Sequence, residues 1–169
     1  MLHLPFSHTV TLIIITIAIS LLAFSNQAVM NRLIFWPPAM QRGQYDRFIT
    51  HGFIHADGAH LLFNMITLFF FGNIIESFYR QFFYDMGFVL FYLGGLIVAI
   101  LPSYLKHRHD VHWASLGASG AVSAVLFAYI LFQPWNLIFV FFIPVPAIIF
   151  AVLYVAYSIW SGKRGNSNI

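Results

Sequence analysis

The stretch WASLGASGAV, residues 113–122, places a hydroxyl group between two glycines inside the longest uncharged part of the chain. Residues 111–162 contain no Asp, Glu, Lys or Arg, and residues 1–31, 59–75 and 86–105 form three further uncharged runs. A membrane-spanning helix needs about 20 mostly apolar residues. Each of the three shorter runs therefore has room for one span, and the longest run has room for two.

The composition excludes an ordinary soluble domain. Of the 169 residues, 60% are hydrophobic and 8% are charged, against roughly 25% charged residues in soluble proteins. The excess of 8 basic over 5 acidic residues is small, so we expect the lipid bilayer as a partner and no nucleic acid. The first run lacks a basic amino-terminal region and is interpreted as a span, not as a signal peptide. The sequence contains no cysteine, which excludes disulfides and a cysteine nucleophile.

We predict an all-α fold, a polytopic membrane helical bundle that forms one domain over residues 1–169. The expected helices cover residues 9–24, 59–78, 83–105, 117–132 and 145–161. Pro144 and Pro146 suit a first helical turn, which is why the fifth helix is expected to begin at residue 145. The long loop 25–58 is too apolar for a disordered linker, and we expect it to pack on the bundle or lie in the interface. Antiparallel threading places the starts of the second and fourth helices on the same face of the membrane.

Polar side chains stand at both of these helix starts. His60 and Asn64 are four residues apart, on one face of the second helix, and Ser119 lies at the start of the fourth. Polar groups in a bilayer usually face the bundle interior or a water-filled cavity. A hydroxyl, an imidazole and an amide can surround a reacting carbonyl, with Ser119 attacking and His60 and Asn64 donating hydrogen bonds to the oxyanion. The amino-terminal N–H groups of the fourth helix would add to this stabilisation.

Each motif also has a purely structural interpretation. Gly117 and Gly120, followed by Ala121, are typical of a small-residue helix contact in which Ser119 forms an interhelical hydrogen bond. The pair formed by His60 and Asn64, taken alone, is typical of a structural hydrogen bond. Their joint position on one face of the membrane favours chemistry over packing.

A metal site is a further possibility for the histidines of this region. His51, His55 and His60 are spaced by four and five residues. A zinc protease helix would have a glutamate between two histidines at the spacing His-Glu-x-x-His, and no carboxylate supports the histidines here. We therefore expect neither a metal nor a cofactor.

The same residues resemble the rhomboid intramembrane serine proteases over about residues 44–161. The resemblance rests on an ordered set of motifs: Tyr45-Asp46-Arg47-Phe48 leading to His51 and His55, His60-x-x-x-Asn64, Gly72-x-x-x-Glu76 and Gly117-Ala118-Ser119-Gly120. It implies a six-helix bundle, of which this chain holds five helices. It further implies that Ser119 is the nucleophile, and that its own N–H, His60 and Asn64 form the oxyanion hole. Arg47, Glu76, Gly117 and Gly120 would be structural residues near the site.

The resemblance also implies an activity and a location. The protein would be an endopeptidase that cleaves transmembrane-helix substrates by acyl-enzyme chemistry. It would be a multi-pass integral membrane protein, and a bacterial inner membrane is the expected location.

The chain departs from the family pattern at three places. Asp46 stands where the family often has Trp, and Ser123 stands where some members have Tyr. The family takes its catalytic histidine from a sixth helix, and residue 169 comes before any such helix. We therefore expect a C-terminally truncated protease, inactive alone because a serine hydroxyl without a base is a poor nucleophile. The alternative is a catalytically inactive rhomboid-like protein that binds transmembrane helices. A transporter or channel would need intramembrane charges or paired broken helices, and the sequence shows neither clearly.

Membrane orientation has two conflicting indications. Seven of the 8 basic residues fall on the side of the loop 25–58, which the positive-inside rule places in the cytoplasm; they are Arg32, Arg42, Arg47, Lys106, Arg108, Lys163 and Arg164. The resemblance implies the opposite side for this loop and for the site. Both orientations leave the chemistry unchanged.

Overall fold

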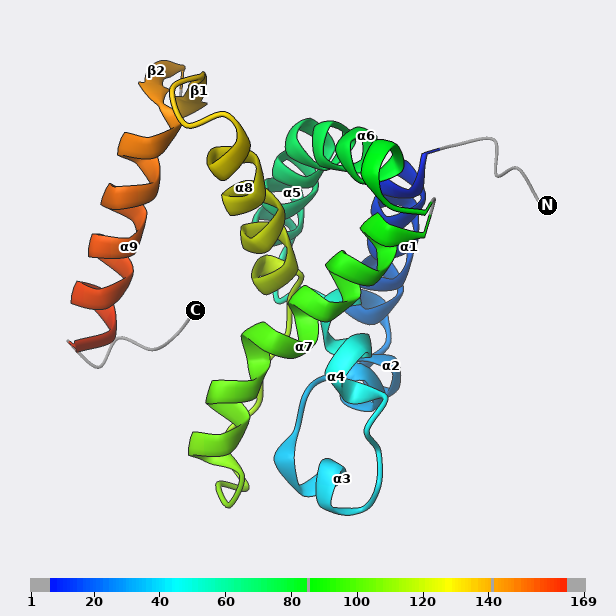
Figure 1. Ribbon diagram of the computed structural model, residues 1–169. Coiled ribbons are helices and arrows are strands. Elements are labelled where there is room, and N and C mark those ends of the chain that lie inside the picture. The colour runs from blue at the N-terminus through cyan, green and yellow to red at the C-terminus, as the bar shows by residue number, and fades with distance from the viewer. Residues whose placement is uncertain (1–6, 85, 141, 164–169) are drawn as a thin grey trace. The chain divides into compact units, whose positions relative to one another are not determined.

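A computed structural model describes residues 7–84, 86–140 and 142–163, with side chains described as far as residue 157. The chain forms two compact units, residues 1–126 and 127–169, and each is considered by itself (Figure 1). The polar tail that follows residue 163, including Arg164, lies outside the described residues.

Three helices of the first unit are long and apolar enough to cross a membrane. They are α1 (His8–Ser25), the continuous helix Gly58–Phe82 and α7 (Gly87–His107). The second of these consists of α5 (Gly58–Thr67), a π-helical turn η2 (Leu68–Gly72) and α6 (Asn73–Phe82). Two shorter apolar helices follow, α8 (Ser119–Phe132) and α9 (Ala147–Lys163). Each predicted span therefore corresponds to a helix.

The third predicted helix begins four residues later than expected. Phe83 is extended, with φ −130° and ψ 167°, and its N–H donates to the Tyr79 carbonyl at the end of α6. The chain therefore turns between Phe83 and Gly87. A Cβ at Gly87 would lie 3.0 Å from the Phe83 Cβ and 3.1 Å from Tyr79 Cδ1, so this turn is tightly packed against the end of α6.

Glu76 ties α6 to the beginning of α1. Its carboxylate accepts hydrogen bonds from the backbone N–H groups of His8 and Thr9, at 2.9 and 2.8 Å. These are N–H groups of the first helical turn, which have no partner within the helix and favour a negative charge. One turn earlier, Gly72 makes room for α1, because a Cβ there would lie 2.8 Å from Thr9 Cγ2. The Gly72-x-x-x-Glu76 motif thus fixes the contact between these two helices.

The loop 25–58 folds into short helices that pack on the end of α7. They are α2 (Gln27–Leu33), α3 (Pro37–Gln41), α4 (Arg47–Thr50) and a 3₁₀ turn η1 (His51–Phe53). Phe35 is fully buried at the centre of a cluster with Met40, Ile100, Phe48, Tyr104 and Trp113. Two side chains of the loop also bind the segment that follows α7: Trp36 Nε1 donates to the Val111 carbonyl and Gln41 Nε2 to the Arg108 carbonyl, both at 2.9 Å. The loop is therefore part of the bundle.

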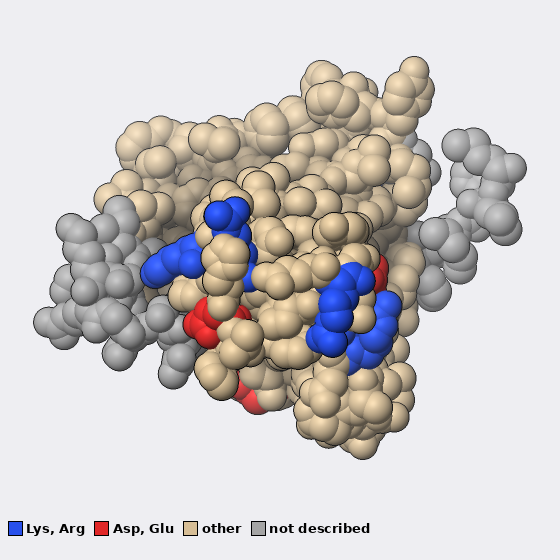
Figure 2. All heavy atoms as spheres, turned by 90° about the horizontal axis from the view of Figure 1, so that it is seen from below, with Lys and Arg blue, Asp and Glu red and all other residues tan. Residues whose placement is uncertain are grey.

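Basic side chains gather around this packed loop. Figure 2 views the molecule from below and shows Lys and Arg in separate groups, with Asp and Glu beside them. Arg32 forms an ion pair with Asp46 at 2.7 Å, and the hydrogen bond from Arg32 lowers the pKa of the Asp46 carboxyl. Lys106 lies in the last turn of α7. In the first unit, Arg32 and Lys106 therefore both lie at the end of the bundle where the loop 25–58 packs on α7.

The second unit contains a β-hairpin, which corrects the all-α prediction. Strand β1 (Leu137–Val140) pairs antiparallel with β2 (Ile143–Pro146), with Val140 opposite Ile143 and Leu137 opposite Pro146. The prediction that a helix begins at residue 145 is wrong, because Pro144 and Pro146 lie in β2 and α9 begins at Ala147. Figure 1 shows the hairpin between the end of α8 and the start of α9.

Candidate functional site

The first part of the candidate site is the beginning of α5. Asp57 precedes this helix in an extended conformation, and its carboxylate accepts a hydrogen bond from the His60 N–H at 2.8 Å. This is an N-cap, in which a short polar side chain binds an otherwise unpaired N–H of the first turn. One turn later, Asn64 Nδ2 donates to the His60 carbonyl at 2.9 Å, and Asn64 is buried. The cap and this hydrogen bond hold His60 and Asn64 on one face of α5.

The second part is the extended segment that leads into α8. Phe35 and Ser115 exchange two backbone hydrogen bonds, at 2.9 and 3.0 Å. The Gly117 N–H donates to the His51 carbonyl at 2.9 Å, and the Ala118 N–H donates to His55 Nε2 at 3.3 Å. The loop 25–58 therefore fixes the backbone immediately before Ser119.

Ser119 is the first residue of α8. The sequence predicted that this helix begins at Gly117, and that prediction is wrong by two residues. Gly117 has φ +114°, a conformation that side-chain-bearing residues rarely adopt. Because α8 begins at Ser119, the Ser119 N–H belongs to the first turn of this helix, where N–H groups have no helical partner.

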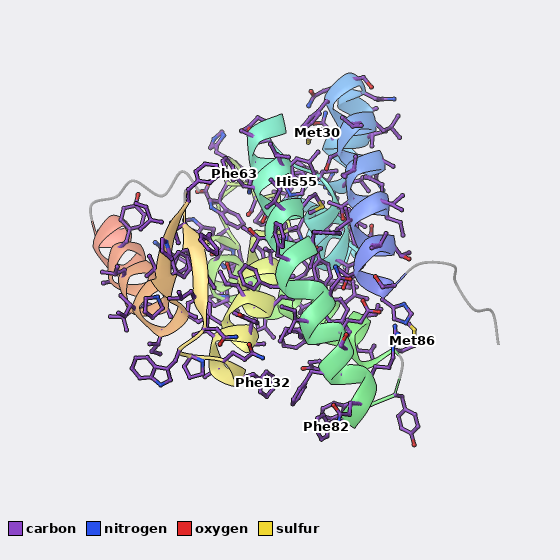
Figure 3. All side chains as sticks on the ribbon, turned by 90° about the horizontal axis from the view of Figure 1, so that it is seen from above. Met30, His55, Phe63, Phe82, Met86 and Phe132 are labelled. Carbon is purple, nitrogen blue, oxygen red and sulfur yellow. The ribbon has the colours of Figure 1, made fainter. Side chains whose placement is uncertain are left out.

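His55, which is labelled in Figure 3, links α1 to the segment before α8 through hydrogen bonds. Ser20 Oγ donates to the Phe53 carbonyl at 3.0 Å and lies 3.0 Å from His55 Nδ1. Since this hydroxyl hydrogen is directed to Phe53, the Ser20 oxygen accepts from Nδ1–H. The unprotonated Nε2 then accepts from the Ala118 N–H. The arrangement requires neutral His55 in its Nδ1–H tautomer.

The pKa of His55 reflects this burial. His55 is fully buried, and desolvation together with the nearby His60 lowers its pKa from 6.5 to about 4. Burial also lowers the pKa of His51, whose Nδ1 donates to the Arg47 carbonyl at 2.8 Å. Both imidazoles are therefore structural neutral groups near pH 7. Because both ring nitrogens of His55 are already bonded, this residue is not available to accept a proton from Ser119.

His60 brings the two parts of the site together. Its ring meets the His55 ring edge-on, with centroids 5.0 Å apart and planes at 80°. A Cβ at Gly117 would lie 2.8 Å from His60 Cε1 and 3.3 Å from Nε2. The His60 imidazole therefore rests directly on the Gly117 backbone, two residues before Ser119. The starts of α5 and α8 meet, as antiparallel threading predicts.

Gly120 has a different role from Gly117. A Cβ at Gly120 would lie 2.4 Å from the Ala99 Cβ on α7, and the Gly95 carbonyl oxygen would be 3.8 Å away. On the other side of this contact, a Cβ at Gly95 would lie 3.2 Å from Ala121 Cα. Gly120 thus belongs to a close α7–α8 contact of small residues, while Gly117 gives space to His60.

Arg47 is a structural residue of the loop. It is buried, and its guanidinium donates to the Gln44 side chain at 2.8 Å and to the Asn31 carbonyl at 3.0 Å, with a further hydrogen bond to the Ile34 carbonyl. Three acceptors are suited to a group with five N–H donors in a fixed plane. Arg47 thereby holds together the turns that position Phe35 and His51.

Sequence reasoning missed two residues that position the site, Asp57 and Ser20, and the role of a third, His55. Asp57 carried a recognisable signal, because a short polar residue directly before an apolar run is a typical N-cap. Ser20 carried none, since it lies 35 residues from its partner His55 in the sequence. His55 itself was noted as part of the loop motif, but its hydrogen bond to Ala118 depends on the fold.

The fold and this site define a polytopic helical membrane protein with polar residues converging at two helix starts. The family model of the Rhomboid domain matches residues 42–169. The chain is 31% identical over 158 residues to "RHOMBOID-like protein 12, mitochondrial" of Arabidopsis thaliana, covering 86% of this chain and 47% of that protein. It is 29% identical over 126 residues to "Rhomboid protease GlpG" of Enterobacter sp. (strain 638), covering 72% of this chain and 41% of that protein.

"Rhomboid protease GlpG" of Klebsiella pneumoniae (strain 342) is 28% identical over 124 residues, with 72% of this chain and 41% of that protein covered. This chain belongs to the rhomboid family and is a multi-pass membrane protein. It spans less than half the length of these relatives.

Proposed function

We propose that this chain belongs to an intramembrane serine endopeptidase, with Ser119 as its nucleophile. The contact of the His60 ring with Gly117 is the observation that carries this proposal, because it brings the beginning of α5 to the residues directly before Ser119. Membership of a family composed mostly of serine proteases supports it further. The proposed substrates are proteins with transmembrane helices.

In the proposed reaction, Ser119 Oγ attacks the scissile carbonyl carbon while its proton passes to a general base. The oxyanion accepts hydrogen bonds from His60, from Asn64 Nδ2 and from the Ser119 N–H. Asn64 can take part because an amide nitrogen carries two hydrogens and one of them is used by the His60 carbonyl. The C–N bond then breaks, the amine leaves with a proton from the base, and water hydrolyses the acyl-enzyme.

The proposed base is the histidine that the family resemblance assigns to a sixth helix. His55 is excluded for this role by its two hydrogen bonds. Residues 1–169 by themselves are therefore expected to hold the nucleophile and the oxyanion donors but to show no proteolysis. We further propose a bacterial inner membrane as the location; relatives from Enterobacter and Klebsiella support it, while the Arabidopsis relative is named mitochondrial.

The test is cleavage of a reporter transmembrane helix by the full-length protein in liposomes. Wild type is expected to cut it, Ser119→Ala to lose all activity, and Asn64→Ala to retain some because two oxyanion donors remain; loss of one donor typically costs about a hundred- to a thousandfold in rate. Full activity of Ser119→Ala would contradict the serine mechanism. A wild type that captures the helix without cutting it would instead support a catalytically inactive, helix-binding rhomboid-like protein.

A further inference from the structure

The hairpin of the second unit presents an apolar surface where a soluble hairpin would be polar. Its outer face carries Leu137 and Phe139, whose side chains are 57% and 74% exposed, whereas Ile138 between them is buried. An antiparallel sheet with one face in water normally has polar residues on that face. At the turn, Phe142 is 95% exposed.

Phe142 is also unusual in its backbone. Its φ is +70°, a conformation that is rare for bulky residues and is most easily adopted by Gly, Asn or Asp in hairpin turns. A large aromatic side chain therefore occupies a strained position at the most exposed point of the hairpin. Almost none of the Phe142 surface is covered by the described part of the chain. Its ring can therefore contact only the surroundings of the protein.

The edge of β2 is suited to surroundings with little water. Pro144 and Pro146 alternate with Ile143 and Val145, which stand opposite Val140 and Ile138. Paired residues of an antiparallel ladder alternate between hydrogen-bonded and non-hydrogen-bonded pairs. Since proline has no N–H, the two prolines must be the non-bonded positions, whose backbone nitrogens face outward. The β2 edge therefore presents no N–H donor at these positions, and an unpaired donor is costly wherever water is scarce.

The length of the neighbouring helix agrees with a hairpin at the membrane surface. α9 has 17 residues, and Lys163 at its far end is the first charged residue after Asp110. The 16 steps from Lys163 to Ala147 correspond to about 24 Å of helix, less than the roughly 30 Å of a hydrocarbon core. If Lys163 marks one boundary of the core, the base of the hairpin lies close to the other. Trp135, 77% exposed, then stands where aromatic belts occur.

We propose that the β1–β2 hairpin is a lipid-binding anchor seated in the headgroup–acyl boundary of the bilayer, with Leu137, Phe139 and Phe142 in contact with lipid. The partner is the lipid surface itself, continuous with the lipid around α8 and α9. The hairpin fixes the depth at which α8 ends. This inference rests on the multi-pass membrane fold and is independent of the proposed protease activity.

Depth-dependent fluorescence quenching tests the proposal. A tryptophan-free full chain, with the four tryptophans replaced by Phe, receives Phe142→Trp and is reconstituted in phosphatidylcholine vesicles with or without brominated acyl chains. The matched control is His109→Trp, in the charged turn after α7. The residue-142 probe is expected to emit at shorter wavelength, to be quenched by the brominated lipid and to be protected from acrylamide. The residue-109 probe is expected to show the reverse.

A second probe keeps the native sequence of the hairpin. In a chain with Trp36, Trp113 and Trp160 replaced by Phe, the remaining Trp135 is expected to be quenched by brominated lipid as well. Quenching of the residue-142 probe by acrylamide and not by brominated lipid would overturn the proposal, because the hairpin would then lie in water. Resistance to both quenchers would overturn it too, because the hairpin would then be covered by protein.

Discussion

His55 shows how a single residue links the loop to the residues before the proposed nucleophile. Its neutral ring accepts from Ala118 through Nε2 and donates to Ser20 through Nδ1. Protonation at Nε2 would place two donors face to face and break the bond to Ala118. Burial and the nearby His60 lower the pKa of His55 to about 4, which keeps the ring in the neutral form that this arrangement requires.

The first prediction is a loss of stability in acid. The pKa of His55 is about 4 in the folded protein and 6.5 in the unfolded chain, so the unfolded chain binds the proton first as pH falls. The free energy of unfolding should be unaffected by His55 above about pH 6.5 and should fall by roughly 3 kcal/mol between 6.5 and 4. His55→Gln keeps an acceptor and a donor but does not titrate. Unfolding titrations in detergent should thus show a flatter pH dependence for this variant; equal slopes would contradict the account.

The second prediction concerns Gly117. Gly117→Ala places a Cβ 2.8 Å from His60 Cε1 and strains a backbone at φ +114°, at a cost of about 1–3 kcal/mol for the backbone alone. Thermal unfolding in detergent should reveal this loss of stability. His60→Ala removes the steric conflict but not the strain. The double variant should therefore be more stable than the sum of the two single effects predicts, and simple additivity would show that the His60 ring does not rest on Gly117.

At the scale of elements, the close approach of α7 and α8 depends on small side chains. Gly120 faces Ala99, and Gly95 faces Ala121. Helices in membranes associate largely through such close packing, since burial of apolar surface from lipid gives little driving force. The contact aligns α8, which begins with Ser119.

Exchanging the two small residues tests this contact. Gly120→Ala creates a Cβ 2.4 Å from the Ala99 Cβ, and overpacking of this kind typically costs about 1–3 kcal/mol. Ala99→Gly should remove the conflict, so the double variant should recover most of the lost melting temperature. Ser119→Ala serves as a control on the same helix and should change stability less. Absence of recovery in the double variant would place Gly120 elsewhere than against Ala99.

The sequence predicted the helices better than their ends. Long apolar runs establish the spans, but Gly117, the expected first residue of α8, is turned out of the helix because the loop binds the N–H groups at 117 and 118. Pro144 and Pro146 are as compatible with the start of a helix as with the edge of a hairpin. The local sequence pattern alone does not distinguish these two structures. His60 and Asn64 were found because polar groups are rare in apolar runs. Ser20 was not, because only the fold brings it to His55.

At the scale of the whole molecule, the first unit is organised around the loop 25–58. Arg47 holds its turns together, Phe35 anchors it on α7, and His51 and His55 bind the backbone before Ser119. The loop therefore connects α1, α5, α7 and the start of α8. In a rhomboid-family protein this arrangement would keep the proposed nucleophile fixed while substrate helices approach.

The central claim is that Ser119 and His60 share one site, and cysteine cross-linking tests it most directly. The chain has no native cysteine, so His60→Cys with Ser119→Cys gives a clean pair in native membranes. We predict that the Ser119 hydroxyl and the His60 imidazole lie roughly 4 to 7 Å apart, which lets one carbonyl oxygen lie between donors. A short bifunctional methanethiosulfonate should therefore join the two cysteines rapidly.

The control pair combines Ser119→Cys with Leu62→Cys. Leu62 comes two residues after His60 in α5, so it does not share the face that carries His60 and Asn64, and it is 55% exposed. Fast cross-linking of the pair 60–119, detected by mass spectrometry of the joined peptides, together with no cross-linking of the pair 62–119 is the predicted result. Equal rates for the two pairs, or no cross-link between residues 60 and 119, would contradict the shared site.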